Sequence, residues 1–369
     1  MIKYKYIVLV LTVLLAGFLY FSLQNKNTNT QGEEFLHGKI KSISSLDSNI
    51  QSLDIEIIKG SLLGQNITIE EDQSLYLNRR NFENGDKVLI QYTQDGNEFV
   101  ITDFVRSDVL LWLFLLFTFF VVLIAKWQGI GAILGMLITF LVLFKISLPW
   151  ILKGGDPITV AIVSSLLIIP STFFSSHGFN RKTIVSVLST LLTLVIAGTL
   201  ASIFSDLANL TGLASEAASF IKMSTAENIN FKGLLLAGML IGVLGVLDDI
   251  TISQAAIVQE LRSSKIDISK SELYQRAMNV GRAHIASIVN TIILIYTGSA
   301  LPLLLLLFDY SEPFSQIINF EPFAEEIIRT LIGSLGLILA VPITTFISIY
   351  ALKGIEGNAR ADLHRHIHT

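Results

Sequence analysis

The sequence predicts a membrane all-α helical bundle of about eight transmembrane helices, with a small extracytoplasmic β-rich domain inserted after the first helix. Three observations predict it. The 369-residue chain is 51% hydrophobic and only 15% charged, whereas soluble domains carry about 25% charged residues. Eight apolar stretches approach the roughly 20 residues that a membrane crossing needs. The composition changes near residue 107, before which lies a stretch that resembles a soluble domain.

These patterns predict four parts of the chain. They are a signal anchor or first transmembrane helix at 1–28, the β-rich domain at 29–107, a seven-helix transmembrane domain at 108–355 and a cytoplasmic tail at 356–369.

The first apolar stretch runs from Ile7 to Leu23 and follows two lysines. A cleaved signal peptide would look similar. However, Ala16-Gly17-Phe18 is a poor cleavage site, and the apolar run continues through Phe21. We therefore favour an uncleaved anchor and leave cleavage open.

Seven further spans follow in the second half of the chain. We expect them at Val109–Ala125, Ile130–Leu148, Ile158–Phe174, Ile184–Phe204, Gly233–Leu247 with an extension beyond it, Ile285–Phe308 and Ile327–Leu352. Only four residues, 126–129, separate the first two, which predicts a tight helical hairpin.

The basic residues predict the orientation, because short cytoplasmic loops are enriched in lysine and arginine. With eight spans and a cytoplasmic N-terminus, most basic residues of the short loops and the tail fall on the cytoplasmic side. The chain is then expected in the plasma membrane with both ends inside the cell and residues 29–107 outside it.

The extracytoplasmic part reads as five short strands rich in β-branched residues. We expect them at Phe35–Ile43, Leu53–Ile58, Gln65–Ile69, Lys87–Tyr92 and Glu98–Val105. Asn84-Gly85-Asp86 and Asp95-Gly96-Asn97 are turn signals. Five strands in so short a segment suggest an OB-like barrel by analogy, and a folded cap or assembly module is the simplest role.

Two adjacent carboxylates, Asp248 and Asp249, stand at the cytoplasmic end of the sixth predicted span. Ionisable groups within a span are costly and often functional. On a helix, Asp248 shares a face with Thr251, whereas Asp249 points about 100° away. One interpretation is a site for a cation or proton, with Gln254 nearby. The other is a solvated pair that caps a new helix over residues 251–263.

Polar residues also gather in the seventh predicted span. Arg282 and His284 enter from the cytoplasmic side and could pair with the aspartates, or could serve packing alone. The other candidate pathway residues are Asn290, Thr291, Tyr296 and Pro302. Proline removes a backbone hydrogen bond, and transporters use such broken helices to bind solutes, although a simple kink is the alternative.

Small residues four apart, Gly131 with Gly135 and Gly238 with Gly242, predict close helix packing.

Several segments resemble the YibE/F family of bacterial membrane proteins. They are Gly245-Val-Leu-Asp-Asp-Ile-Thr-Ile-Ser-Gln-Ala-Ala, Gly281-Arg-Ala-His-Ile-Ala-Ser, Val289-Asn-Thr, Tyr296-Thr-Gly-Ser-Ala-Leu-Pro-Leu, Arg329-Thr-Leu-Ile-Gly-Ser-Leu-Gly-Leu, Ala340-Val-Pro-Ile-Thr-Thr and His177-Gly-Phe-Asn-Arg-Lys-Thr. The resemblance covers about residues 100–352. It implies a polytopic membrane protein and supports the choice of site residues, but it supplies no substrate.

The leading functional hypothesis is a transporter or channel for a small solute or ion. The sequence leaves open whether the chain forms a homo-oligomer. The alternative is a membrane accessory or assembly protein whose outer domain binds a partner. An enzyme is not expected: an intramembrane aspartyl protease needs aspartates from two helices, and no metal-hydrolase or Walker motif occurs. No cofactor is expected, and no metal site is assigned. The net charge of −4 and the lack of basic runs disfavour nucleic acid, and the chain has no cysteine.

Overall fold

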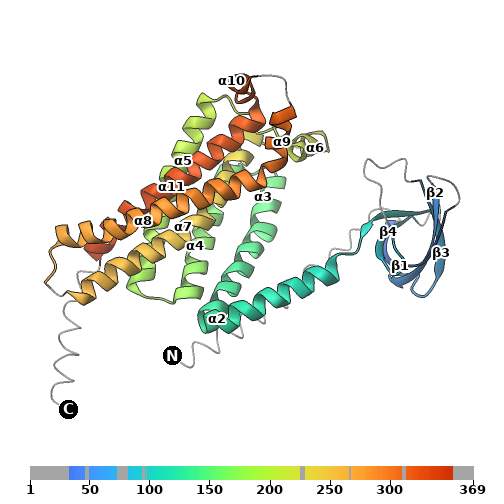
Figure 1. The fold of residues 1–369 in the computed structure, drawn as a ribbon, viewed down its shortest axis with the longest axis horizontal. Helices are drawn as coiled ribbons and strands as arrows, with labels where there is room; N and C mark the ends of the chain where they lie inside the picture. Colours follow the sequence, from blue (N-terminus) through green and yellow to red (C-terminus); the bar gives the residue numbers. More distant parts are fainter. Residues whose placement is uncertain are drawn as a thin grey trace, which may run out of the picture. The chain divides into compact units, whose positions relative to one another are not determined.

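The structure, a computed structural model, describes residues 33–45, 50–72, 82–93, 96, 98–224, 229–265, 267–309 and 313–351. The predicted span Ile7–Leu23 and the predicted tail at 356–369 lie outside these residues, as does most of the turn at Asp95-Gly96-Asn97. The chain divides near residue 124 into two compact units, one holding the sheet and one holding most of the helices (Figure 1).

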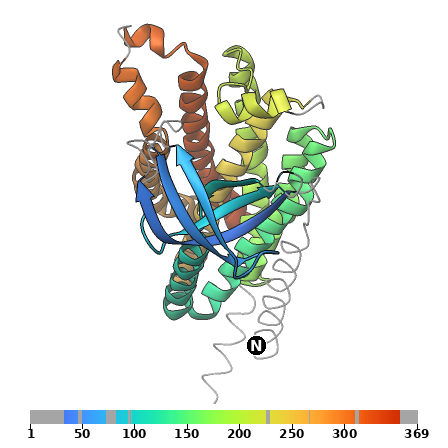
Figure 2. The same ribbon diagram turned by 90° about the vertical axis from the view of Figure 1, so that its right-hand side faces the viewer.

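The first unit holds a five-stranded antiparallel sheet of order β3-β2-β1-β4-β5. Its strands are β1 Glu33–Ser45, β2 Ile50–Lys59, β3 Asn66–Asp72, β4 Lys87–Thr93 and β5 Glu98–Phe104. All five predicted strands are present. The sheet curls into a half-barrel (Figure 2). No pairing joins β3 to β5 among the described strands, so the OB-like closure stays a prediction.

A glycine allows the central strand of this sheet to pass between its two neighbours. A Cβ atom at Gly38 would lie 2.3 Å from Ile55 Cγ2 and 2.7 Å from Ile90 Cδ1. Both isoleucines are fully buried in the core of the sheet. The predicted turn at Gly85 is confirmed, because its φ of +100° is a value that glycine adopts readily.

Among the residues that the structure describes, six helical segments are long and apolar enough to cross a membrane. The first comprises α2 Ser107–Val142, η2 Leu143–Ser147 and α3 Leu148–Leu152, and the others are α4 Pro157–His177, α5 Arg181–Leu207, α7 Phe231–Ser264, α8 Lys270–Ser299 and α11 Glu321–Ala351. The short helices are α6 Glu216–Ser224, α9 Leu301–Asp309 and α10 Phe314–Ile317. The chain is therefore a mostly helical membrane protein.

Seven spans were predicted in this region, against six candidate segments. The difference arises because two predicted spans, Val109–Ala125 and Ile130–Leu148, lie in the single run 107–152. Within it, Lys126 leaves the helical region, with φ 52° and ψ −125°. The eight-span count stays a prediction.

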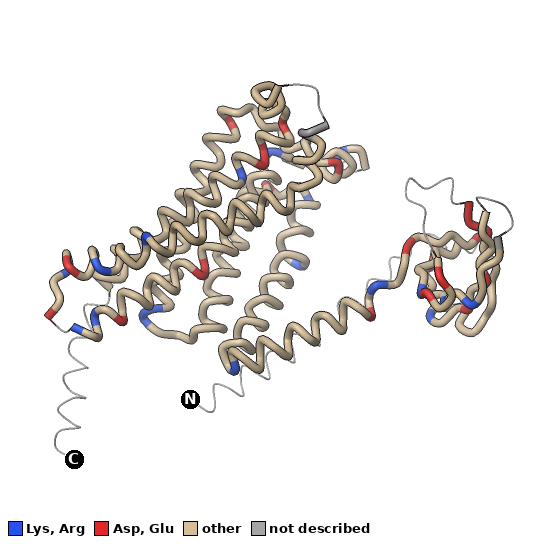
Figure 3. Tube along the Cα trace, in the orientation of Figure 1, with Lys and Arg blue, Asp and Glu red and all other residues tan. Residues whose placement is uncertain are grey.

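Polar side chains begin four of the long helices. Asp156, Asn180, Asn230 and Ser269 each accept a hydrogen bond from the backbone N–H three residues later. Such N-caps satisfy amides that have no partner within the helix. Charged residues are sparse along the middle of the long helices (Figure 3).

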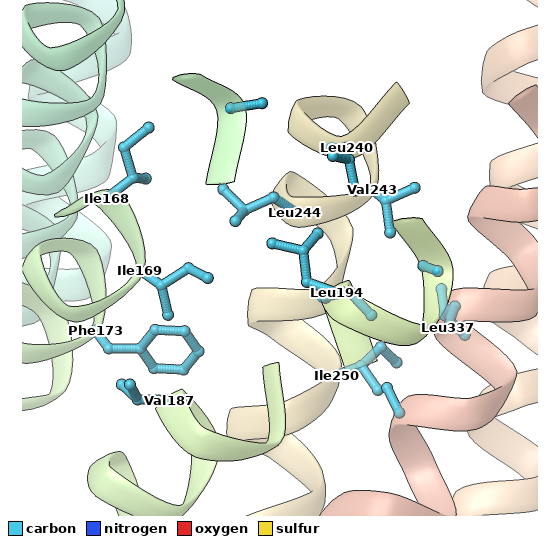
Figure 4. Close-up of a cluster of buried hydrophobic side chains, with 14 of the residues drawn as sticks. Ile168, Ile169, Phe173, Val187, Leu194, Leu240, Val243, Leu244, Ile250 and Leu337 are labelled. Atoms are coloured by element: carbon cyan, nitrogen blue, oxygen red, sulfur yellow. The ribbon is translucent and has the colours of Figure 1, made fainter. Parts of the chain in front are cut away.

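The helical unit is centred on α5, α7 and α11, which pack against one another, with α4 against α7 and α5, and α8 against α11 and α7. Figure 4 shows the buried side chains where α4, α5, α7 and α11 meet. Gly131 packs against α4, since a Cβ atom there would lie 2.1 Å from the backbone oxygen of Ser175. Gly238, by contrast, faces open space, so its predicted packing role is not met within the described chain.

Candidate functional site

The carboxyl group of Asp248 lies where α7 packs against α4. Its Oδ2 atom is 3.3 Å from the Thr172 hydroxyl. That hydroxyl also lies 3.1 and 3.0 Å from the carbonyl oxygens of Ile168 and Ile169, and it has only one hydrogen to donate. Oδ1 of Asp248 is buried and has no hydrogen-bond partner among the described residues. The carboxyl group is therefore short of donors.

Helix α7 is unbroken from Phe231 to Ser264. The interpretation that the aspartates cap a new helix near Thr251 is therefore wrong, because the backbone there is mid-helix. Near the start of α7, Lys232 pairs with Asp206 at 2.5 Å. Asp248 lies sixteen residues further on (248 − 232), or roughly 24 Å at 1.5 Å per residue. That distance is shorter than the roughly 30 Å thickness of a hydrocarbon core.

The neighbouring carboxylate, Asp249, is exposed. His177, the last residue of α4, lies close enough to Asp249 for their charges to interact. The sequence singled out His177 only as part of a turn, because its approach to α7 depends on how α4 packs. The two adjacent aspartates thus occupy different environments, one partly buried and one open.

Buried hydroxyl groups of α5 face α7 beside the aspartates. Oγ1 of Thr190 lies 2.8 Å from Oγ1 of Thr251, and Oγ of Ser186 lies 3.3 Å from the Thr251 carbonyl oxygen. Most of these groups also donate to a carbonyl four residues earlier in their own helix, as Ser189 and Thr193 do. Such back-bonding uses the hydrogen and leaves oxygen lone pairs free. These α5 hydroxyl groups were not predicted from the sequence, although they recur at helical spacing.

Gln254 is 1% exposed and joins three helices. Its Nε2 atom donates to Ala277 O of α8 at 3.1 Å and to Thr345 Oγ1 of α11 at 2.7 Å. Its Oε1 atom is buried with no partner in the described part of the chain. Gly281 lies opposite, where a Cβ atom would be 2.5 Å from a methyl of Val341. The amide therefore fixes the packing of α7, α8 and α11.

The remaining predicted site residues lie on or just after α8. Arg282 is exposed and donates to Asn279 at 3.3 Å, and His284 is half-buried. Across the residues that the structure describes, no hydrogen bond or ion pair joins either of them to the two aspartates. Asn290 and Thr291 are exposed, and Thr291 donates to the Ser287 carbonyl.

The helix breaks where the sequence predicts, between the end of α8 at Ser299 and the start of α9 at Leu301. The carbonyl of Tyr296 accepts hydrogen bonds from Ala300 N at 3.0 Å and from Ser299 Oγ at 2.8 Å. Pro302 is exposed. The carbonyl of Tyr296 is thus satisfied within the break itself, which is the pattern of a kink.

A charged cluster at the start of α11 was not predicted. Arg329 pairs with Glu325 at 2.5 Å and with Glu326 at 3.0 Å, and Oε1 of Glu326 is buried without a partner among the described atoms. Glu326 also lines an otherwise apolar groove of about 310 Å³, together with Thr297 and Thr330. The Glu-Glu-x-x-Arg spacing in the sequence could have predicted the cluster, because residues three and four apart on a helix are neighbours.

No group of three or more histidine, aspartate or glutamate side chains that could hold a metal occurs among the described residues. The comparisons with known proteins give one match. A family model described as YibE/F-like protein matches residues 113–354, which is more than half of the chain. No curated protein and no solved structure matches the chain.

Proposed function

The chain belongs to the YibE/F-like family, and from that premise we propose that it is a transporter or channel through which a proton or small cation passes by way of Asp248. One observation carries the proposal. A carboxyl group lies within an apolar helical unit with one oxygen buried and unpartnered among the described residues. Such a group is costly unless another partner compensates it.

The surroundings favour a positively charged ligand. Hydroxyl groups of α4 and α5 offer oxygen lone pairs here, because they also donate to carbonyls of their own helices. Thr172 contacts Asp248 itself, whereas Ser186 and Thr190 contact Thr251, about one turn further along α7. No lysine or arginine side chain forms an ion pair with Asp248 in the described ranges. A proton or a hard cation such as Na⁺ binds oxygen ligands of this kind. Binding would supply the charge that the site lacks.

A line of small residues on α7 supports access to the site. Gly238, Gly242 and Gly245 are exposed and lie on the helix face that carries Asp249. No side chain or backbone atom would contact a Cβ atom placed at Gly238 or Gly245. The backbone of α7 is therefore uncovered at Gly238 and Gly245 on the face that carries Asp249, whereas the Tyr296 hydroxyl lies 3.3 Å from a Cβ atom placed at Gly242.

The proposed topology has eight spans with both termini in the cytoplasm and residues 29–107 outside the plasma membrane. A helical run of 46 residues, about 69 Å long at 1.5 Å per residue, exceeds twice a hydrocarbon thickness of about 30 Å. Two crossings that meet at Lys126 account for that length. We assign no enzymatic reaction and no cofactor to the site.

The test is ion flux in proteoliposomes that contain the full chain. Asp248→Asn removes the charge with little change in shape, and Asp249→Asn is the matched control at the exposed neighbour. We expect proton or Na⁺ flux from the wild type, retained flux in Asp249→Asn and loss of flux in Asp248→Asn. Equal flux in all three proteins would remove Asp248 from the mechanism, and no flux in the wild type would refute transport of these ions.

One observation favours the alternative of an accessory protein. The described half-barrel has two edge strands, β3 and β5, each paired on one side only. Open edges can add a strand from a partner. Crosslinking from β5 should then capture a single partner protein in membranes, and a failure to capture one would count against this role.

A further inference from the structure

Helix α8 is poorly buried for a membrane-spanning helix. Only 11% of its most apolar stretch is buried, against 39% in α4, 50% in α5 and 61% in α7 and α11, and only the far more apolar run 107–152, at 0%, is buried less. It is also the least apolar of the six candidates. A helix with this composition should be covered by protein, because exposed polar side chains in lipid lack partners.

The exposed residues of α8 form a regular seam. Six exposed positions are separated by steps of four, three, four, three and four residues. They are Asn279, Ala283, Ala286, Asn290, Ile293 and Thr297. This alternation is the a/d pattern of a left-handed coiled coil. Ile292, on the opposite side of α8, is 2% exposed, so Asn290 points away from the helices that α8 packs against. At the end of the seam, Ile293 and Thr297 also line the groove shared with α9, α10 and α11.

The seam carries a side chain that needs a hydrogen-bonding partner. Asn290 lies in the apolar part of α8, and its amide forms no side-chain hydrogen bond with any residue that the structure describes. Neighbouring Ala286 and Ala283 are small enough to let another helix backbone approach closely. The seam therefore suits a helix that presents a carboxamide of its own.

We propose that a second copy of this chain packs its α8 against this seam in a homodimer. All copies insert into the membrane with the same orientation, so a twofold axis along the membrane normal brings the two α8 helices together in parallel. Each seam residue then meets its own equivalent. A carboxamide both donates and accepts hydrogen bonds, so Asn290 pairs with Asn290 of the second copy.

Other apolar segments of this chain fit the seam less well. The stretch Val109–Ala125 offers one hydroxyl, Thr118, and no carboxamide. The stretch Ile7–Leu23 offers hydroxyls at Thr12, Tyr20 and Ser22 and likewise no carboxamide. Lipid offers no hydrogen-bonding partner at this depth.

Disulfide crosslinking tests the arrangement directly, because the natural chain has no cysteine. A disulfide requires two Cβ atoms about 3.8 Å apart. We expect Asn290→Cys and Ala286→Cys to form dimers on oxidation in membranes. Ile295→Cys is the matched control, since Ile295 is 62% exposed on the same helix but lies about 140° around it from Asn290. Equal crosslinking at 290 and 295, or none at 290 and 286, would overturn the proposal.

A second measurement identifies the occupant and the contribution of the amide. A photo-crosslinking amino acid at position 290 should give an adduct of twice the chain mass. An adduct within one chain, to another protein or only to lipid would refute a second copy. Asn290→Leu should weaken dimerisation in liposomes roughly three- to thirty-fold, as expected for the loss of one or two interhelical hydrogen bonds. Single-molecule photobleaching measures the dimer fraction. Unchanged dimerisation would show that the amide is not at the interface.

Discussion

Replacing Gly131 by alanine should separate α2 from α4. The added Cβ atom would lie 2.1 Å from the Ser175 backbone oxygen and 2.8 Å from its carbonyl carbon. Real Cβ atoms essentially never approach closer than 3.0 Å, so the helices must move by at least 3.0 − 2.1 = 0.9 Å. Such overpacking costs about 1–3 kcal/mol. The gain from replacing glycine within a helix offsets about 1 kcal/mol of this, which leaves a net loss of about 0–2 kcal/mol.

Gly238→Ala is the matched control, because it makes the same change at a helical glycine with nothing within 4 Å. It should stabilise the protein by about 1 kcal/mol through helix propensity alone. The assay is reversible unfolding of the purified protein in mixed detergent micelles, with the free energy of unfolding compared between variants. We expect Gly131→Ala to be less stable than Gly238→Ala by about 1–3 kcal/mol. Equal stabilities would refute the close packing of α2 on α4.

Two further predictions concern the polar contacts. Gln254→Leu removes the hydrogen bonds to Ala277 and Thr345 and should lower the free energy of unfolding in the same micelle assay by about 1–3 kcal/mol; an unchanged value would mean that the amide does not hold the three helices together. In the sheet, hydrogen bonds from the Ser42 and Thr68 hydroxyls hold the pKa of Asp54 below its ordinary value of 3.8. Because this pKa is lower in the folded than in the unfolded protein, the ionised carboxylate stabilises the fold at any pH above the pKa of the unfolded state. The stabilisation is lost as the pH falls through the pKa of the folded state. The protection factors of the β2 amides, taken relative to the intrinsic exchange rate at each pH, should therefore fall in acid more in the wild type than in Asp54→Asn, and identical acid profiles of protection would contradict this linkage.

The local elements were largely predictable from the sequence. Alternating β-branched residues and the Asn84-Gly85 turn located the strands of the sheet, because both signals depend on a few neighbouring residues. The break after Ser299 was also visible, since Gly298 and Pro302 lie close together and both weaken a helix. The helix that contains the aspartates was harder, because Asp248 can begin a new helix or sit within a longer one, and only its packing against α4 decides between them.

Residues that act between helices were less predictable. Thr172 and His177 belong to the surroundings of the aspartates only because α4 packs beside α7, and no local pattern encodes that contact. The α5 hydroxyls were missed because serine and threonine that bond back to their own helix look unremarkable in an apolar run. Conversely, Arg282 and Asp248 have opposite charges, yet in the described structure Arg282 donates to Asn279 on its own helix.

A path for ions to Asp248 requires that position 248 be reached by ions in water, which chemical labelling can measure. Because the chain has no cysteine of its own, Asp248→Cys can be treated with a membrane-impermeant, positively charged thiol reagent. Two variants serve as controls. Ile250→Cys places the thiol at a fully buried position, and Val195→Cys places it on an apolar face of α5, where Val195 is 65% exposed. We expect modification at position 248, independent of added Na⁺, and none at 250 or 195. An unreactive cysteine at position 248 in folded protein would contradict a path for ions to Asp248.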